Sequence, residues 1–211
     1  MPHVVLLGDS IFDNAAYVGR GPDVVAQLAA ALPAGWRATL LAVDGAVVDD
    51  VGRQLARIPD DATHLVVSAG GNDALAHTGL LDRPATSSAQ VLGWLADAVE
   101  GFERRYRRLL DEVVRLGLPT TLCTIYEGNL GPPVQRLART ALAVFDDAIL
   151  RLAAERGLPT IELRHVCTEP ADYANPIEPS VRGGEKIARA IVTVVTGKGR
   201  DLERITEGTR N

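Results

Sequence analysis

The chain has 211 residues, of which 46% are hydrophobic and 23% are charged, and its formal net charge is −5. This composition is typical of a soluble globular protein, and the length predicts a single domain over residues 1–211. The acidic balance and the lack of a basic stripe argue against nucleic acid as a partner.

Short apolar runs alternate along the chain with longer amphipathic runs. The apolar runs are rich in Val, Leu, Ile and Thr, as is typical of parallel strands that are covered on both faces. They predict strands over residues 4–7, 39–43, 64–68, 120–125 and 160–163. Apolar residues at helical spacing predict helices over residues 22–32, 47–58, 89–116, 134–156 and 183–195.

This alternation predicts an α/β fold, in which helices cover both faces of a parallel sheet. The helix over 89–116 carries an apolar stripe at helical spacing, and the stripe of the helix over 183–195 favours a place in the core. The arginine cluster of the helix over 89–116, residues 104–108, lies among acids as a solvated helix face does. The polar residues 197–211 predict a flexible tail.

Polar turns that contain glycine follow the first three predicted strands. Gly8-Asp9-Ser10 ends the first strand, Asp44-Gly45 follows the second, and Gly70-Gly71-Asn72-Asp73 follows the third. Ligands of such sheets bind at the carboxyl ends of the strands, where these turns converge. Ser10 is placed there as a nucleophile. The backbone N–H groups of Ser10 and Gly45 and the side-chain amide of Asn72 offer three donors to an oxyanion.

The set Gly8-Asp9-Ser10, Gly45 and Gly71-Asn72-Asp73 resembles the motifs of the SGNH, or GDSL-type, serine hydrolases. The resemblance runs from the first strand to the last helix. It implies a three-layer α/β/α sandwich with a five-stranded parallel sheet, which is a flavodoxin-like arrangement. It also implies hydrolysis of esters or thioesters without a metal or organic cofactor. Ser10 would be the nucleophile, and Ser10, Gly45 and Asn72 would form the oxyanion hole.

The fourth motif of that family, Asp-x-x-His ahead of the last helix, differs in this chain. The matching stretch reads Asn175-Pro176-Ile177-Glu178-Pro179-Ser180. Glu178 therefore stands at the histidine position and Asn175 at the aspartate position. In the family, the histidine takes the serine proton and the aspartate orients the histidine. A serine hydroxyl is a weak nucleophile without a neighbouring base, so the residue that activates Ser10 is the open question.

Three interpretations of this change remain open from the residues alone. In the first, Glu178 is the base, its pKa is raised by burial near other carboxylates, and Asn175 holds it by a hydrogen bond. In the second, another histidine is the base. His77 and His165 both lie past strand ends at this edge, and His165, which follows the fifth strand, would complete a Ser10–His165–Glu178 triad. In the third, the site has lost ester hydrolysis and binds a small ligand.

We predict an esterase or thioesterase that cleaves a small ester through an acyl-enzyme on Ser10, with Asp9, Asp73 and Asn175 lining the site. The flanking loops, residues 74–87 and 167–182, hold few long apolar side chains, which predicts no broad apolar groove for a long acyl chain. The expected partner is a small-molecule substrate, and no metal or cofactor is expected.

The sequence also carries expectations about the compartment. Cys123 and Cys167 have no metal-ligand spacing and are expected to be free buried thiols. The first residues carry no basic leader, and no stretch reaches the roughly 18 apolar residues that span a bilayer. These features predict a cytoplasmic protein without a membrane span.

Overall fold

The predicted strands pair into one parallel sheet with the order β2-β1-β3-β4-β5. The computed structural model describes residues 1–197, and the predicted tail lies outside these residues from 198 onward. The strands are β1 (His3–Gly8), β2 (Arg37–Leu40), β3 (His64–Ser68), β4 (Thr120–Cys123) and β5 (Thr160–Ile161). Their number, direction and order confirm the predicted α/β fold of flavodoxin-like type.

The helices within residues 1–197 are α1 (Val24–Ala31), α2 (Val48–Leu55), α3 (Gly71–Leu75), α4 (Ser88–Arg115), α5 (Val134–Glu155), α6 (Leu163–Val166) and α7 (Val181–Val195). The five long predicted helices are all present. The short α3 and α6 were not predicted, because one turn leaves too few residues to show a helical period. None of the helices in this part of the chain combines the length and apolarity that a bilayer crossing requires.

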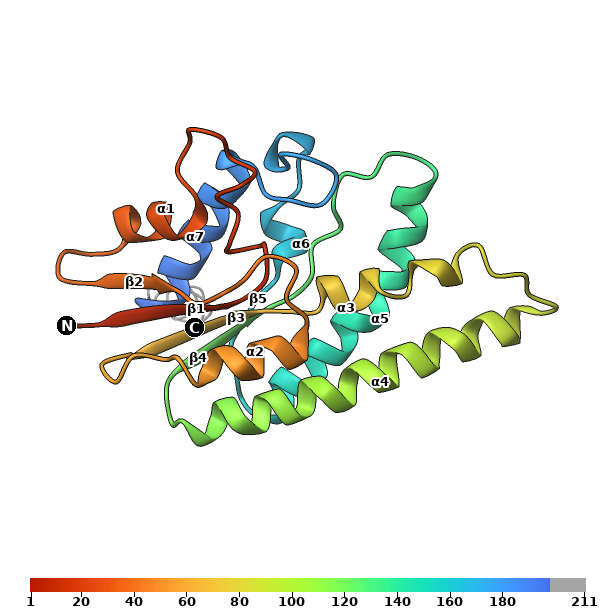
Figure 1. Cartoon of the computed structure of the whole chain (residues 1–211), viewed down its shortest axis with the longest axis horizontal. Coiled ribbons are helices and arrows are strands. Elements are labelled where there is room, and N and C mark those ends of the chain that lie inside the picture. Colours follow the sequence, from red (N-terminus) through yellow and green to blue (C-terminus); the bar gives the residue numbers. More distant parts are fainter. Residues whose placement is uncertain (198–211) are drawn as a thin grey trace, which may run out of the picture.

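The sheet separates two apolar cores, and β1 contributes to both. Successive side chains of a strand point to opposite faces, so Val4 and Leu6 pack with residues of α1 and α7, such as Leu28. Val5 and Leu7 face the other core, which is built from α2, α4 and α5. Figure 1 shows these two helical layers on opposite sides of the sheet. The structure thus has the three layers that the resemblance implied.

The N-terminal turns of α4 extend past the edge of the sheet at which β1 ends (Figure 1). The predicted apolar stripe of α4 is therefore buried only over the sheet. Phe102 and Leu110 are fully buried, whereas Leu92 is 65% exposed. This part of the stripe lies outside the core, because the helix extends here past the sheet.

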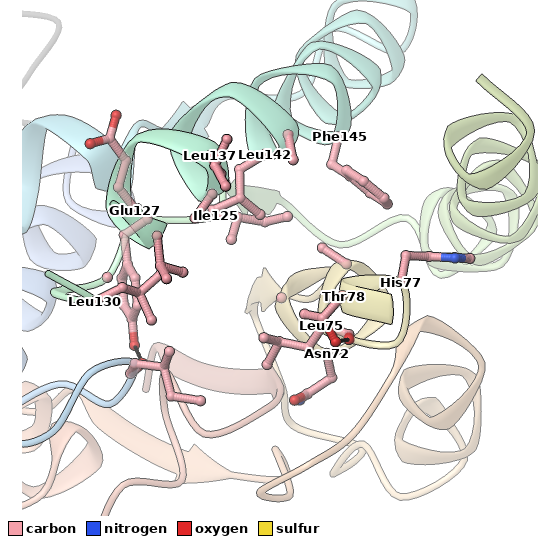
Figure 2. Close-up of a pocket in the computed structure, with 18 of the residues that line it drawn as sticks. Asn72, Leu75, His77, Thr78, Ile125, Glu127, Leu130, Leu137, Leu142 and Phe145 are labelled. Atoms are coloured by element: carbon pink, nitrogen blue, oxygen red, sulfur yellow. Dashed lines mark hydrogen bonds between the residues drawn. The ribbon is translucent and has the colours of Figure 1, made fainter. Parts of the chain in front are cut away.

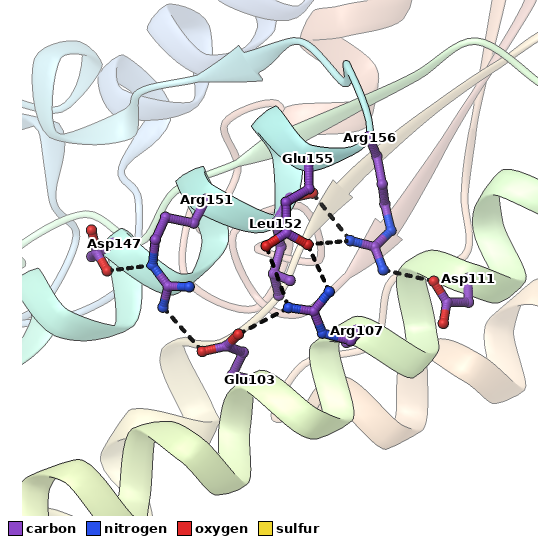
Figure 3. A network of polar contacts seen from close by, with 8 residues as sticks. All are labelled: Glu103, Arg107, Asp111, Asp147, Arg151, Leu152, Glu155 and Arg156. Carbon is purple, nitrogen blue, oxygen red and sulfur yellow. Dashed lines mark hydrogen bonds and ion pairs between the residues drawn. The ribbon is translucent and has the colours of Figure 1, made fainter.

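A network of ion pairs joins α4 to α5 (Figure 3). Arg107 of α4 bonds Glu155 of α5 at 2.6 Å, and Arg151 of α5 bonds Glu103 of α4 at 3.0 Å. Glu103 also pairs with Arg107 at 3.1 Å, one helical turn away, as predicted for a solvated arginine cluster. These ion pairs hold the second half of α4 against the C-terminal part of α5.

Candidate active site

Ser10 lies directly after β1, at the carboxyl edge of the sheet. A Cβ atom on Gly8 would lie 1.8 Å from the carbonyl oxygen of Ser68, and the φ angle of Gly8 is +137°. Only glycine therefore allows β1 to end this close to β3. The chain turns sharply at Asp9, whose Oδ1 accepts a hydrogen bond from the N–H of Ile11 at 3.1 Å. This turn leaves Ser10 only 9% exposed, on the wall of a cavity.

Glu178 lines the same cavity and is 5% exposed. Burial raises the pKa of the Glu178 carboxyl, a hydrogen bond from the Ser10 side chain opposes this shift, and the charge of Asp44 adds to it. The second carboxylate oxygen, Oε2, is buried and has no hydrogen-bond partner. A carboxylate thus lies near the candidate nucleophile, and its Oε2 atom is both unpartnered and shielded from solvent.

Backbone contacts hold the loop that carries Glu178. The Oδ1 atom of Asn175 accepts hydrogen bonds from the N–H groups of Ile177 and Glu178, both at 2.9 Å. Asn175 therefore contacts the backbone of Glu178, and no hydrogen bond joins its amide to the Glu178 carboxylate. The hydroxyl of Tyr126, which follows β4, donates to the carbonyl of Ile177. The side-chain amide of the buried Asn14 donates to the carbonyl of Pro179 at 3.2 Å.

Besides the N–H of Ser10, the proposed oxyanion donors are the side-chain amide of Asn72 and the N–H of Gly45, which come from two further turns. Asn72 of α3 lines the cavity, and its Nδ2 donates to the carbonyl of Ala46 at 3.0 Å. An amide nitrogen carries two hydrogens, so one remains for a ligand. Gly45 precedes Ala46 on an exposed turn with a φ angle of +78°, which favours glycine. Gly45 does not line the cavity of Ser10 and Glu178.

His165 lies apart from these residues. It is exposed on α6, and it does not line the cavity that contains Ser10. The histidine that does line the cavity is His77, whose ring centre lies 6.3 Å from that of Phe145. Within residues 1–197, no three His, Cys, Asp or Glu side chains gather in an arrangement that could hold a metal ion.

Asp9 is buried beside Ser10, and burial raises its pKa to about 7, with further contributions from the charges of Glu178 and Asp73. An acid with a raised pKa binds more protons in the folded state than in the unfolded state between about pH 4 and pH 7. The free energy of unfolding therefore falls as the pH rises through this range.

We expect Asp9→Asn to remove the part of this pH dependence that Asp9 contributes, because an amide carries no charge and still accepts the hydrogen bond of the Ile11 N–H. The buried Asp146, whose pKa is also raised to about 7, should leave a residual slope in the variant. The variant should gain stability over the wild type at pH 8 by at most about 4 kcal/mol, and little at pH 4. Urea unfolding at the two pH values measures the difference. An equal effect at both would show that Asp9 is not the group that titrates.

The cavity beside Ser10 has a volume of about 730 Å³ and is mostly apolar. Figure 2 shows Leu130, Leu137, Leu142 and Phe145 on one side and Leu75 and Asn72 of α3 on the other. Trp94 and Leu95 of α4 complete the wall. The prediction that the site has no broad apolar groove is therefore wrong. The lining comes from α5, from the segment 125–133 before it, from α3 and the residues that follow α3, such as Leu80 and Leu81, and from the N-terminal part of α4. Leu75, Leu80 and Leu81 belong to a loop that the sequence suggested was poor in long apolar side chains.

Fold, cavity and serine turn together define an α/β protein with a hydrolase-like pocket at the carboxyl edge of its sheet. The sequence model of the GDSL-like lipase/acylhydrolase family matches residues 6–184. The chain therefore belongs to the GDSL-like lipase/acylhydrolase family, and the resemblance drawn from its motifs is confirmed. No curated protein matches the sequence.

Solved structures share this fold at low sequence identity. An extracellular lipase from Streptomyces rimosus superimposes with a TM-score of 0.67 at 18% identity, covering 93% of this chain and 99% of the lipase. A phospholipase A1 from Streptomyces albidoflavus NA297 gives a TM-score of 0.68 at 18% identity, with coverage of 93% and 99%. An acetyl xylan esterase from Geobacillus stearothermophilus gives 0.62 at 20% identity, with coverage of 90% and 93%.

Proposed function

We propose that this protein is a serine esterase that uses Glu178 in place of histidine as the general base. The observation that carries the proposal is that Ser10 and the buried carboxylate of Glu178 lie on the wall of the same large cavity, where the Ser10 side chain lowers the pKa of Glu178 against the effect of burial. An exposed carboxylate is a poor match for a serine proton. Burial raises the pKa of Glu178 and so makes its carboxylate a stronger base, better suited to take the proton of a serine hydroxyl.

The reaction would proceed through two tetrahedral intermediates. Glu178 takes the proton of Ser10 as Oγ attacks the ester carbonyl, and the carbonyl oxygen becomes an oxyanion. The free hydrogen of Asn72 and the N–H groups of Gly45 and Ser10 are the donors proposed to stabilise that charge. Glu178 then returns the proton to the leaving alcohol, which leaves an ester on Ser10. Water enters, gives a proton to Glu178 and attacks this ester, releasing the acid and restoring Ser10.

The free Oε2 atom of Glu178 supports the second half of this sequence. A buried acceptor without a partner costs free energy, which a bound donor would recover. The hydroxyl of the leaving alcohol and the hydrolytic water are donors of this kind. Because Oε2 is shielded from solvent in the free enzyme, it would hold the alcohol and then the water only once the Glu178 side chain turns it toward the cavity.

The apolar cavity supports a substrate with a substantial apolar chain. A volume of about 730 Å³ lies well within the usual range of small-molecule sites. Each methylene that enters such a pocket contributes about 0.8 kcal/mol, which corresponds to about fourfold in kcat/KM. We therefore propose that the enzyme prefers esters with longer chains to acetate esters.

A series of p-nitrophenyl esters from acetate to decanoate tests the proposal. We expect kcat/KM to rise by about fourfold per methylene until the pocket is full, with a burst of nitrophenol at high enzyme concentration. Ala141→Phe places a ring on a wall residue and should shift the optimum to shorter chains, by at least about tenfold for decanoate. Ala143→Phe, on the exposed face of α5, is the matched control and should leave the profile unchanged. Absence of hydrolysis and of a burst with every ester would instead favour a binding protein.

A further inference from the structure

Arg105 of the α4 cluster pairs with a buried carboxylate, whereas Arg107 and Arg108 pair with more exposed ones. Arg104 is 69% exposed, and its closest acidic partner is Glu100, at 3.9 Å in the same helix. The side chain of Arg105 is 30% exposed and reaches out of α4 to Asp73 of α3, with 3.0 Å between NH2 and Oδ1. The Asp73 side chain is 2% exposed. A partly buried ion pair thus joins α4 to the turn that carries Asn72.

Asp73 also contacts the turn on the other side. Its Oδ2 accepts a hydrogen bond from the N–H of Val48 at 3.0 Å. The preceding residue, Asn72, donates from Nδ2 to the carbonyl of Ala46 at 3.0 Å. Two adjacent residues of α3 therefore hold the segment 46–48, which follows Gly45 directly. These hydrogen bonds set how the turn of Gly45 lies relative to the amide of Asn72.

The positive charge of Arg105 allows the buried Asp73 to stay ionised and to accept the hydrogen bond of the Val48 N–H. A buried carboxylate without a cation is costly, and the protein then protonates it, admits water or moves it toward solvent. Arg105 is the cation that pairs with Asp73 among residues 1–197. Without it, the acceptor for the Val48 N–H and the position of α3 would both change.

We propose that Arg105 is a positioning residue for the oxyanion hole, acting through Asp73 to fix the amide of Asn72 against the turn of Gly45. The inference rests on the proposed function, because it assigns Asn72 and Gly45 to an oxyanion. Arg105 itself lies outside the cavity and touches no substrate atom. Its effect should be confined to the transition state, in which the oxyanion exists, and should spare ground-state binding.

A double-mutant cycle between Arg105 and Asn72 tests this role. With the best p-nitrophenyl ester, we expect Arg105→Gln to lower kcat by about tenfold at unchanged KM. Asn72→Ala should lower kcat by about 10²–10³-fold. If Arg105 acts through Asn72, the double variant should be no slower than Asn72→Ala alone. Arg104→Gln is the matched control on the same helix and should keep the wild-type kcat.

Amide hydrogen exchange gives a second readout that does not need activity. The N–H of Val48 should exchange faster in Arg105→Gln than in the wild type, and at the wild-type rate in Arg104→Gln. Arg105→Lys keeps the charge and should restore part of kcat and part of the protection of the Val48 N–H from exchange. This variant also allows the test if Arg105→Gln folds poorly. Multiplicative losses in the double variant, or unchanged Val48 exchange, would overturn the inference. An enzyme that hydrolyses no ester but shows faster Val48 exchange in Arg105→Gln would overturn the proposed function and uphold the positioning by Arg105.

Discussion

Replacing Glu178 with glutamine is expected to lower kcat by about 10²–10⁴-fold, because an amide of the same shape cannot take the Ser10 proton. Glu127→Gln is the matched control. Glu127 also lines the cavity, but its carboxylate pairs with Arg139 at 2.6 Å and does not contact Ser10. Stopped assays with a long-chain p-nitrophenyl ester measure both rates. An unchanged rate in Glu178→Gln would show that another group is the base.

The pH profile separates a carboxylate base from a histidine base. Glu178 acts only when deprotonated, so the wild-type rate should rise with pH through its raised pKa and then reach a plateau. The residual rate of Glu178→Gln should lack this step. The double variant Asn175→Asp/Glu178→His rebuilds the Asp-x-x-His motif. It should exceed Glu178→Gln in rate and titrate near the ordinary histidine pKa of about 6.5.

Replacing Ser10 with alanine is expected to abolish the acyl-enzyme and to lower kcat by roughly 10⁴-fold or more. An activated fluorophosphonate should label the wild type on the peptide that contains Ser10 and should leave Ser10→Ala unlabelled. The burst of nitrophenol should vanish with the label. Mass spectrometry of the digested protein locates the modified residue.

Ser68 provides the control for this experiment. It lies on the wall of the same cavity and is 3% exposed, but it belongs to the end of β3 and no catalytic role is proposed for it. Ser68→Ala should therefore keep both the labelling and the burst. Labelling of a residue other than Ser10 would refute the proposed nucleophile while leaving the family and the fold as they stand.

The sheet edge could be predicted because its residues carry local signals. The close approach of β1 to β3 requires Gly8 at the end of β1, and chain order alone places Ser10 and Asn72 at the same edge, after β1 and β3. The position of Glu178 opposite Ser10 followed from the family motif, since the residues between β5 and α7 have no periodic pattern. The proximity of the two side chains is a property of the folded chain.

The cavity and the ion pair of Arg105 could not be predicted by the same reasoning. An apolar residue on an amphipathic helix gives the same sequence pattern whether it packs in the core or lines a cavity, and Leu95 of α4 lines the cavity. Arg104 and Arg105 are likewise indistinguishable in sequence. Only the rotation of α4 over α3 decides which of the two reaches Asp73.

Because ion pairs join α4 and α5 away from the pocket, the pocket lies between two helix segments that are held together at one end only. The ion pairs at Arg151 and Glu155 hold the helices at one end, and the pocket opens between their N-terminal arms. From Val134 to Arg151 the arm of α5 is about 25 Å long, at 1.5 Å per residue. A tilt of roughly 5° about the fastened end moves the free end by about 2 Å. Small rotations of one helix can therefore change the width of the pocket while the distant charged contacts stay closed.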